Sequence, residues 1–336
     1  MMSLIFVATE RTSQRFSPSR GQPILMQDSE LHKLYLGIVI FLVIATVVGA
    51  ILQSRAKTDK AKATVKNMND RIKAWWIMVA VFATANLAGL TATVLLFMGL
   101  SFLALKEFIK LTPGKDMKAR RLAFYVLVPA QYLLIWFDWY GMFCLLIPVY
   151  AFLFIPTINA IQGDPESFLE RTAKLQWGLM ISVYCVSHAP ALLTLQIPGY
   201  EGENAKLLLY LLLVVQLSDV LQYVWGKTTG KRAISPTISP NKTVEGFLGG
   251  VASATVIGAL LWWATPFTII QSWLMALLIA LAGFAGGLTM SAIKRDKGVK
   301  DFGTLIEGHG GVLDRIDSVC FSAPLFFHVV RYFFTV

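Results

Sequence analysis

The sequence has 336 residues, of which 56% are hydrophobic and only 15% are charged, and its formal net charge is +10. A water-soluble globular domain cannot bury so large an apolar fraction, so the composition excludes that class and indicates an integral membrane protein. Basic residues of membrane proteins gather in cytoplasmic loops, so the positive charge does not point to nucleic acid, and we expect no such partner.

The first 33 residues precede any long apolar run. They lack the apolar core of a secretory signal and contain several serines and arginines. We expect residues 1–33 to form an N-terminal tail, in which Met26 is an alternative start of the chain.

Long apolar segments then follow one another to the C-terminus. A helix that spans a bilayer needs about 20 mostly apolar residues. This length predicts an all-α, polytopic membrane bundle of about ten transmembrane helices. The predicted spans are 34–54, 73–89, 91–108, 121–138, 141–159, 176–196, 206–226, 244–265, 269–293 and 314–335. The run 74–105 is divided at Ala88-Gly89, and a single long tilted helix is the alternative there.

The basic residues test this division. Most of the 30 Lys and Arg residues fall in the segments that follow the odd-numbered spans, and the basic linker 55–72 is the first of these. The positive-inside rule therefore places these segments in the cytoplasm and both termini outside. We expect an integral protein of a bacterial inner (plasma) membrane whose active site faces the cytoplasm.

Two cytoplasmic segments carry polar chemistry. Asp219 lies roughly 10 Å inside the predicted end of its span, where a carboxylate costs about 3 kcal/mol and is expected to be functional or paired. The loop 226–243 that follows is rich in Gly, Pro, Ser and Thr, which predicts an irregular structure. The run 291–318 combines basic residues, carboxylates and glycines between two apolar segments. Cations suit phosphate, carboxylates suit a metal, and glycines let backbone N–H groups approach a ligand.

These residues also carry a resemblance. The pattern S-x-x-K-R-x4-K-D-x6-G-H-G-G-x-x-D-R-x-D-S, from Ser291 to Ser318, is similar to the signature of phosphatidate cytidylyltransferases (CDP-diacylglycerol synthases). The element S-P-N-K-T-V-E-G, from Ser239 to Gly246, resembles the same family's S-P-x-K-T-x-E-G. The resemblance runs from about Arg71 to the C-terminus. We therefore treat 73–336 as a cytidylyltransferase-like membrane domain and 34–54 as an extra helix.

The resemblance implies an enzyme that joins CTP to phosphatidate or a related anionic lipid, with Mg²⁺ or another divalent cation as cofactor. Asp219 and Asp314 are its implied metal ligands. The implied catalytic residues are Asp219, Lys294, Arg295, Lys300, Asp301, Asp314 and Arg315. The implied substrate-binding residues are Ser239, Lys242, Thr243, Glu245, Ser291, His309, Gly310, Gly311 and Asp317. A homodimer is one possible assembly.

The sequence departs from the family pattern at several positions. Gly287 and Met290 stand where the family has acidic residues, so one implied metal ligand is missing. Glu307 precedes the G-H-G-G element in place of proline and is a candidate substitute for that carboxylate. These departures indicate a divergent branch.

Three other functions fit parts of the pattern. A CTP-dependent kinase of a polyprenol-type lipid needs similar phosphate and metal groups, together with a base near the hydroxyl. A transporter of anionic solutes is disfavoured because the charges gather at one membrane face. A non-catalytic membrane paralogue stays open because of Gly287.

Overall fold

The computed structural model describes residues 29–111, 117–305 and 310–336, and these ranges are almost entirely helical. The first half of the chain forms α1 (Ser29–Arg55), α2 (Asp59–Leu87), α3 (Leu90–Lys110), α4 (Met117–Leu122), η2 (Ala123–Leu127), α5 (Val128–Trp136), α6 (Tyr140–Leu145), η3 (Leu146–Ala151), α7 (Phe152–Ile161), α8 (Phe168–Leu179), η4 (Met180–Cys185), α9 (Val186–Ala191) and η5 (Leu192–Thr194). The second half forms α10 (Asn204–Thr228), β1 (Ala233–Ser235), β2 (Ser239–Thr243), α11 (Val244–Leu260), η6 (Trp262–Ala264), α12 (Ile269–Asp296), α13 (Leu313–Ile316) and α14 (Val319–Phe334).

This architecture confirms a polytopic helical membrane bundle. Each predicted span falls on a helix or on a run of consecutive helical elements. Within the described residues, six such segments are long and apolar enough to cross a membrane: 29–55, 90–110, 140–161, 168–194, 204–228 and 269–296. The helices α11 and α14 are apolar but shorter.

Two details near the N-terminus differ from, or refine, the prediction. The segment 55–72, predicted as a loop, is helical from Asp59 onward because α2 begins there. The apolar run 74–105 is broken between α2 and α3, as predicted, and the alternative of one tilted helix is wrong. Gly89 has φ of +95°, a left-handed value that glycine adopts without steric strain. Of the predicted tail, residues 1–28 lie outside the described residues.

Prolines accompany two of the π-helical turns. Pro148 lies inside the π-helical turn η3, and Pro129 is the second residue after the π-helical turn η2. Proline has no N–H for the helical ladder and its ring crowds the preceding turn. Local widening to a π-turn relieves this conflict, so each segment continues through the bundle instead of ending.

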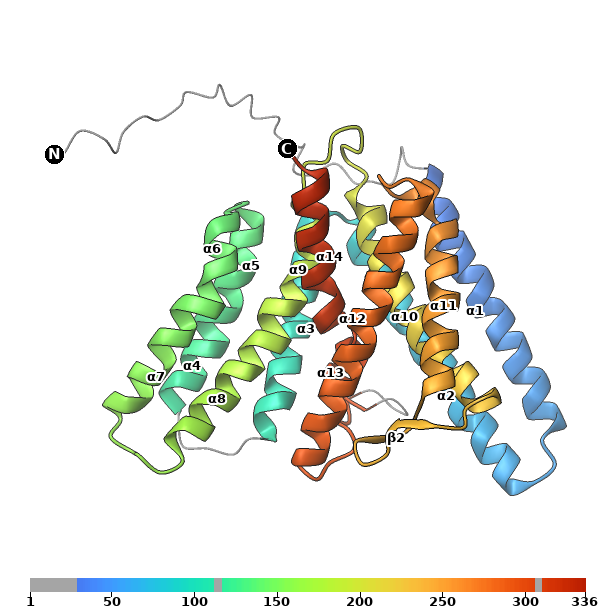
Figure 1. The fold of residues 1–336 in the computed structure, drawn as a ribbon, viewed down its shortest axis with the longest axis horizontal. Coiled ribbons are helices and arrows are strands. Elements are labelled where there is room, and N and C mark those ends of the chain that lie inside the picture. The colour runs from blue at the N-terminus through green and yellow to red at the C-terminus, as the bar shows by residue number, and fades with distance from the viewer. Residues whose placement is uncertain (1–28, 112–116, 306–309) are drawn as a thin grey trace.

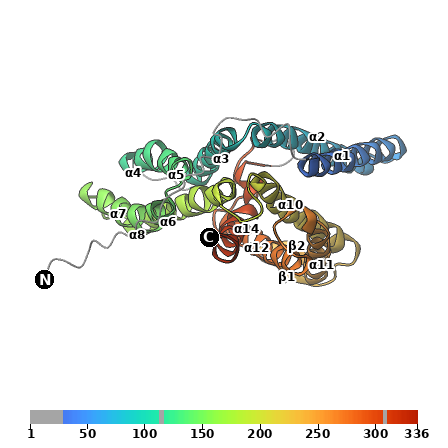
Figure 2. The same cartoon turned by 90° about the horizontal axis from the view of Figure 1, so that it is seen from above.

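The helices stand side by side and alternate in direction (Figure 1). Seen from above, they form an elongated row with α1 and α2 at one end and α4 and α7 at the other (Figure 2). The connections after α1, α7, α10 and α12 all lie at one end of the bundle, the lower end in Figure 1. We call this the basic end, because these connections carry the basic segments of the sequence.

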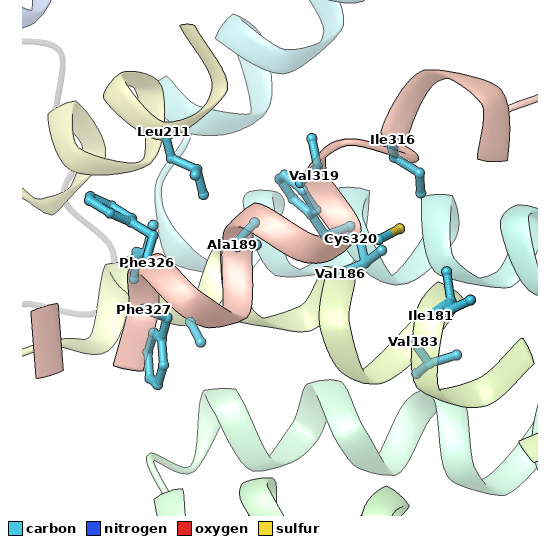
Figure 3. Packing of buried hydrophobic residues seen from close by; sticks show 14 of the residues in the cluster. Ile181, Val183, Val186, Ala189, Leu211, Ile316, Val319, Cys320, Phe326 and Phe327 are labelled. Atoms are coloured by element: carbon cyan, nitrogen blue, oxygen red, sulfur yellow. The ribbon is translucent and has the colours of Figure 1, made fainter. Parts of the chain in front are cut away.

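The apolar core gathers around α14. Val319, Cys320, Phe326 and Phe327 of this helix are buried, and they lie against residues of η4, α9 and α10 (Figure 3). This packing holds the start of α14, and with it the polar residues just before Val319, in a fixed position at the middle of the bundle.

The extra helix α1 is attached to the domain by polar contacts. The Lys206 ammonium is fully buried at the start of α10, and it donates to Glu30 Oε2 of α1 at 2.7 Å and lies 2.8 Å from Glu203 Oε2. Asn86 of α2 donates to the Tyr35 hydroxyl of α1 at 2.8 Å. Much of the remaining α1 surface is exposed and apolar, as a lipid-facing helix requires.

We predict that Lys206→Met lowers the melting temperature of the detergent-purified protein by several degrees. The substitution leaves two carboxylates without their cation, and because both are partly exposed the loss is about 1–3 kcal/mol. Differential scanning fluorimetry with the native tryptophans measures it. Lys33→Met, on an exposed part of α1, is the control. Equal melting temperatures for the two variants would contradict this role of Lys206.

Candidate active site

Two carboxylates from distant parts of the chain meet at the basic end. Asp219 lies on α10 and Asp317 lies between α13 and α14. The Ser318 hydroxyl donates to Asp219 Oδ2 at 2.6 Å, and the Ser318 backbone N–H donates to Asp317 Oδ1 at 2.8 Å. Ser318 thus bridges the two carboxylates. Each keeps one oxygen, Oδ1 of Asp219 and Oδ2 of Asp317, that accepts no hydrogen bond from the described residues.

A lysine ammonium faces the same place. Lys242, on β2, is half-buried, and its Nζ lies 5.1 Å from the centre of the Phe284 ring of α12. A Cβ built on Gly287 would lie 2.8 Å from this Nζ and 3.6 Å from Ser318 Oγ. Burial lowers the pKa of Lys242, while the charges of Asp219 and Asp317 act in the opposite direction. We refer to Asp219, Lys242, Asp317 and Ser318, with Gly287 beside them, as the central cluster.

A second charged pair shapes the neighbouring loop. The buried ammonium of Lys294, on α12, donates to Asp314 Oδ1 at 2.8 Å. Asp314 Oδ2 accepts the backbone N–H groups of Phe302 and Gly311 at 2.8 and 2.9 Å. Both oxygens of Asp314 are therefore engaged within the protein. Asp314 organises the loop, whereas the open oxygens belong to Asp219 and Asp317.

Several predicted residues hold the β1–β2 hairpin against the bundle. Glu245 Oε2 accepts the backbone N–H groups of Lys231 and Arg232 at 2.9 and 3.2 Å. The Thr243 hydroxyl caps α11 by accepting from Gly246 N at 3.1 Å. Arg295 donates to the carbonyls of Ile238 and Val299, both at 3.1 Å. These contacts fix the hairpin and so the position of Lys242.

The other predicted residues make fewer contacts. Ser239 is half-buried on β2, and the Ser291 hydroxyl donates to Gly287 O of its own helix at 2.7 Å. Lys300 and Asp301 are exposed in the loop after α12. The guanidinium of Arg315 lies in the field of the Asp317, Asp314 and Asp301 carboxylates.

The glycine-rich element is described from Gly310 onward. Gly310 has φ of +81°, and a Cβ there would lie 2.8 Å from Asp314 Oδ2, so glycine suits both its conformation and its close approach. His309 and Glu307, predicted at the nucleotide pocket and as a substitute ligand, lie outside the described residues.

One residue beside this loop belongs to neither of the two sequence motifs and was not predicted. Glu107 of α3 is buried, and its Oε1 and Oε2 accept the backbone N–H groups of Val312 and Leu313 at 3.0 and 2.9 Å. A Cβ on Gly303 or Gly311 would lie 2.6 or 2.3 Å from this carboxylate, so both glycines make room for it. One weak signal was available: Glu107 is an acidic residue inside the end of the predicted span 91–108, although Lys106 precedes it directly.

The donor set of the central cluster fits a single small divalent cation. Within residues 29–111, 117–305 and 310–336, no three His, Cys, Asp or Glu side chains group closely enough to form a metal cage. Mg²⁺ does not need one, since it is usually bound by one or two carboxylates together with waters and substrate phosphates. The open oxygens of Asp219 and Asp317 match that pattern.

Comparisons with known proteins agree with this chemistry. The model of the cytidylyltransferase family matches residues 69–333. The chain is 42% identical over 266 residues to the uncharacterized protein YnbB of Escherichia coli K12, which covers 78% of this chain and 87% of YnbB. It is 40% identical over 128 residues to the phosphatidate cytidylyltransferase of Staphylococcus aureus, and 38% identical over 141 residues to that of Aquifex aeolicus.

The two named enzymes are matched only in part. The matches cover 37% and 42% of this chain, and the chain spans about half the length of each enzyme, 49% and 53%. The similarity to YnbB extends over most of both chains.

We predict that Glu107→Gln speeds amide exchange at Val312 and Leu313 by about 10- to 100-fold. A buried hydrogen bond to a charged acceptor contributes about 1.5–3 kcal/mol, and its loss lets the loop open locally. Hydrogen–deuterium exchange with mass spectrometry of peptides that cover 310–318 measures the change. Lys106→Gln, at the exposed neighbouring position, is the control. Unchanged exchange in Glu107→Gln would show that the carboxylate does not hold this loop.

Proposed function

The chain belongs to the cytidylyltransferase family and is a membrane nucleotidyltransferase of phospholipid biosynthesis; from this premise we propose that it joins CTP to phosphatidate. The products are CDP-diacylglycerol and pyrophosphate. One observation carries the proposal: at the basic end of a membrane bundle, two carboxylates lie beside the Lys242 ammonium, and the described residues leave one oxygen of each carboxylate and the ammonium without a hydrogen bond or close ion pair. That combination suits two phosphate-bearing substrates, one of them a lipid.

The reaction makes modest demands on acid–base chemistry. An oxygen of the phosphatidate phosphate attacks the α-phosphorus of CTP, a new P–O bond forms, and the bond from the α-phosphorus to the β-phosphate oxygen breaks. The attacking phosphate is already ionised near neutral pH, so it needs no strong general base. The protein must bring two anions together, align them, and stabilise the charge on the departing pyrophosphate.

Asp219 and Asp317 would hold the divalent cation. Bound there, the cation would neutralise phosphate oxygens and act as a Lewis acid toward them. This assignment differs from the pair expected from the sequence, because Lys294 and two backbone N–H groups already engage Asp314. We retain Asp314 as the residue that shapes the loop and orients Lys294.

The cationic side chains divide into two groups in this proposal. Lys242 and Arg315 bind phosphate oxygens, since the charge of Asp317 acts on both of them. Lys300, exposed in the loop after α12, is assigned to phosphate from its place in the motif alone. Lys294 and Arg295 instead maintain the loop and the hairpin through the contacts described above. His309, Gly310 and Gly311 would shape the nucleotide pocket, with Ser239, Thr243, Glu245, Ser291 and Asp301 as its more distant border.

An apolar groove next to the loop suits the lipid substrate. It has a volume of about 310 Å³, and its apolar lining comes from Phe108 and Leu111 near the end of α3, Ala173 and Trp177 of α8, Ala292 and Ile293 of α12, and Phe302. The lining also includes Thr289 and the charged residues Glu170, Lys174, Asp296 and Lys297. Phe302 also lies beneath the Lys294 ammonium, at 5.3 Å from ring centre to Nζ. An acyl chain in the groove would therefore bring its headgroup to the edge of the charged loop.

The distribution of charge supports a cytoplasmic site. CTP is a cytoplasmic metabolite in cells, and the basic end carries the segments that the positive-inside rule assigns to the cytoplasm. We therefore propose that the basic end faces the cytoplasm of a bacterial inner membrane, with both termini on the opposite side.

We predict that Asp219→Asn and Asp317→Asn each reduce the formation of CDP-lipid by on the order of 100-fold or more, because a cation contributes several kcal/mol of charge stabilisation. The assay uses purified protein, labelled CTP and phosphatidate, with Mg²⁺ or with EDTA. Asp59→Asn is the control, since this exposed carboxylate lies at the same end of the bundle. Full activity of both site variants would contradict the assignment. CDP and a lipid phosphate formed from a lipid alcohol would instead indicate the kinase.

We predict that Ala292→Trp raises the KM for phosphatidate by about 10-fold or more and leaves the KM for CTP within about 2-fold. The indole fills the groove and removes the apolar surface available to an acyl chain. Ala285→Trp, on an exposed face of the same helix, tests for a general effect of tryptophan on α12. Equal changes in the two KM values would show that the groove does not serve the lipid.

A further inference from the structure

Four charged side chains belong to the lining of the apolar groove. Glu170 and Lys174 are one helical turn apart on α8, and Asp296 and Lys297 lie at the end of α12. Because α8 starts and α12 ends at the basic end of the bundle, these charges lie at the end of the groove nearest to it (Figure 1). The two sequence motifs either do not cover these positions or leave them open, and the central cluster does not include them.

Within each ion pair the lysine is more buried than the carboxylate. Lys174 pairs with Glu170, and the Lys297 ammonium lies 2.8 Å from Asp296 Oδ2. The side chains of Lys174 and Lys297 are 26% and 22% exposed, whereas those of Glu170 and Asp296 are 59% and 70% exposed. An ordinary surface ion pair leaves both partners in water. Here the lysines lie along the groove and the carboxylates face outward.

The two ion pairs act on each other across the groove. The charges and contacts of Lys174 and Glu170 affect Lys297, and those of Asp296 and Lys297 affect Glu170. Two ammonium groups on neighbouring helices repel each other unless anions lie beside them, and here Glu170 and Asp296 supply those anions. A lipid phosphate carries negative charge and several acceptor oxygens, so it can serve both ammonium groups at once in place of the two carboxylates.

The rest of the groove suits what such a phosphate would carry. Trp177 and Ile293 line it about one helical turn from Lys174 and Lys297. Lysine stems lie along apolar surface while their ammonium groups stay at its polar boundary. A water-soluble anion would leave this apolar surface unused, whereas a lipid with a phosphate headgroup contacts both parts. The combination of two inner cations and an apolar groove therefore favours an anionic lipid.

We propose that Lys174 and Lys297 bind the phosphate of an anionic lipid whose acyl chain lies in the groove, and that Glu170 and Asp296 hold the two ammonium groups until the lipid displaces them. The inference rests on the proposed function for the identity of this lipid, which is phosphatidate. The two lysines select the lipid by its headgroup, because a diacylglycerol without phosphate lacks the group that they bind. The transfer itself belongs to the central cluster.

Lipid binding without turnover tests the proposal. The full-length protein in detergent, in buffer without CTP or divalent cations, is titrated with fluorescent phosphatidate and with fluorescent diacylglycerol of the same acyl chains. We expect Lys174→Gln/Lys297→Gln to weaken the binding of phosphatidate by about 10-fold or more and to leave that of diacylglycerol within about 2-fold, because only phosphatidate carries the charged group.

The carboxylate variant is expected to change the affinity in the opposite direction. Glu170→Gln/Asp296→Asn removes the groups that compete with the lipid phosphate, so it should bind phosphatidate about 2- to 5-fold more tightly. If the ion pairs only held α8 near α12, both double variants would change the affinity in the same direction, since each breaks both pairs. Lys62→Gln/Lys118→Gln removes two exposed cations elsewhere and is the control for charge.

Several results would overturn the proposal. Unchanged or weaker binding of phosphatidate by a folded Glu170→Gln/Asp296→Asn protein is one, and an equal loss of phosphatidate and diacylglycerol binding in the lysine variant is another. Displacement of the labelled phosphatidate by an equal concentration of inorganic phosphate or CTP would assign the two lysines to a soluble anion instead. A melting curve verifies folding, and the carboxylate variant is decisive even if the lysine variant does not fold.

The two proposals fail separately. A wild type that binds phosphatidate through the two lysines but forms no CDP-lipid with CTP and Mg²⁺ would retain the headgroup site and exclude the cytidylyl transfer. An active Lys174→Gln/Lys297→Gln protein with an unchanged KM for phosphatidate would retain the transfer and exclude the role of the two lysines.

Discussion

Charge buried at the end of a membrane bundle must be neutralised by nearby groups, and this constraint organises the whole basic end. Lys294 and Asp314 neutralise each other, and the remaining oxygen of Asp314 gathers two backbone N–H groups. The Glu107 carboxylate of α3 likewise accepts two backbone N–H groups, those of Val312 and Leu313 at the start of α13. Because an unpartnered buried charge costs several kcal/mol, these contacts hold Phe302 and the residues from Gly311 to Asp314 in place.

The same requirement separates charged side chains that hold the fold from charged side chains that are available to a ligand. At the opposite end, Lys206 is buried between two carboxylates and serves to hold α1 against the domain. In the central cluster, by contrast, Asp219 and Asp317 each keep one oxygen that accepts no hydrogen bond from the described part of the chain, and no close ion pair joins Lys242 to those residues. An arrangement that is incomplete by itself is what a cation and phosphate-bearing substrates would complete.

Glycines allow close approach to charged side chains both in the loop and in the central cluster. Gly303 and Gly311 let the backbone lie against the Glu107 carboxylate, and Gly310 adopts a left-handed conformation beside Asp314. Gly287 has a different role, because the space it leaves lies beside the Lys242 ammonium. The density of glycines in this part of the sequence thus reflects close approach to charged groups, at each position for a separate reason.

The amino-acid pattern alone predicted the membrane class, the succession of helices and the two motifs from which most of the candidate site is built. Apolar runs of bilayer length, the asymmetry of basic residues and two motifs in fixed order are local properties, so they can be read without coordinates. Which carboxylates remain available depended on tertiary structure alone. Asp314 and Asp317 share a short segment and look equivalent in sequence, yet Lys294 and two N–H groups engage one, while the other lies beside Asp219. The contact of Glu107 with Val312 and the close approach of Lys242 to Gly287 each join segments far apart in the chain. Only the packing of α3, β2 and α12 around α14 brings these segments together.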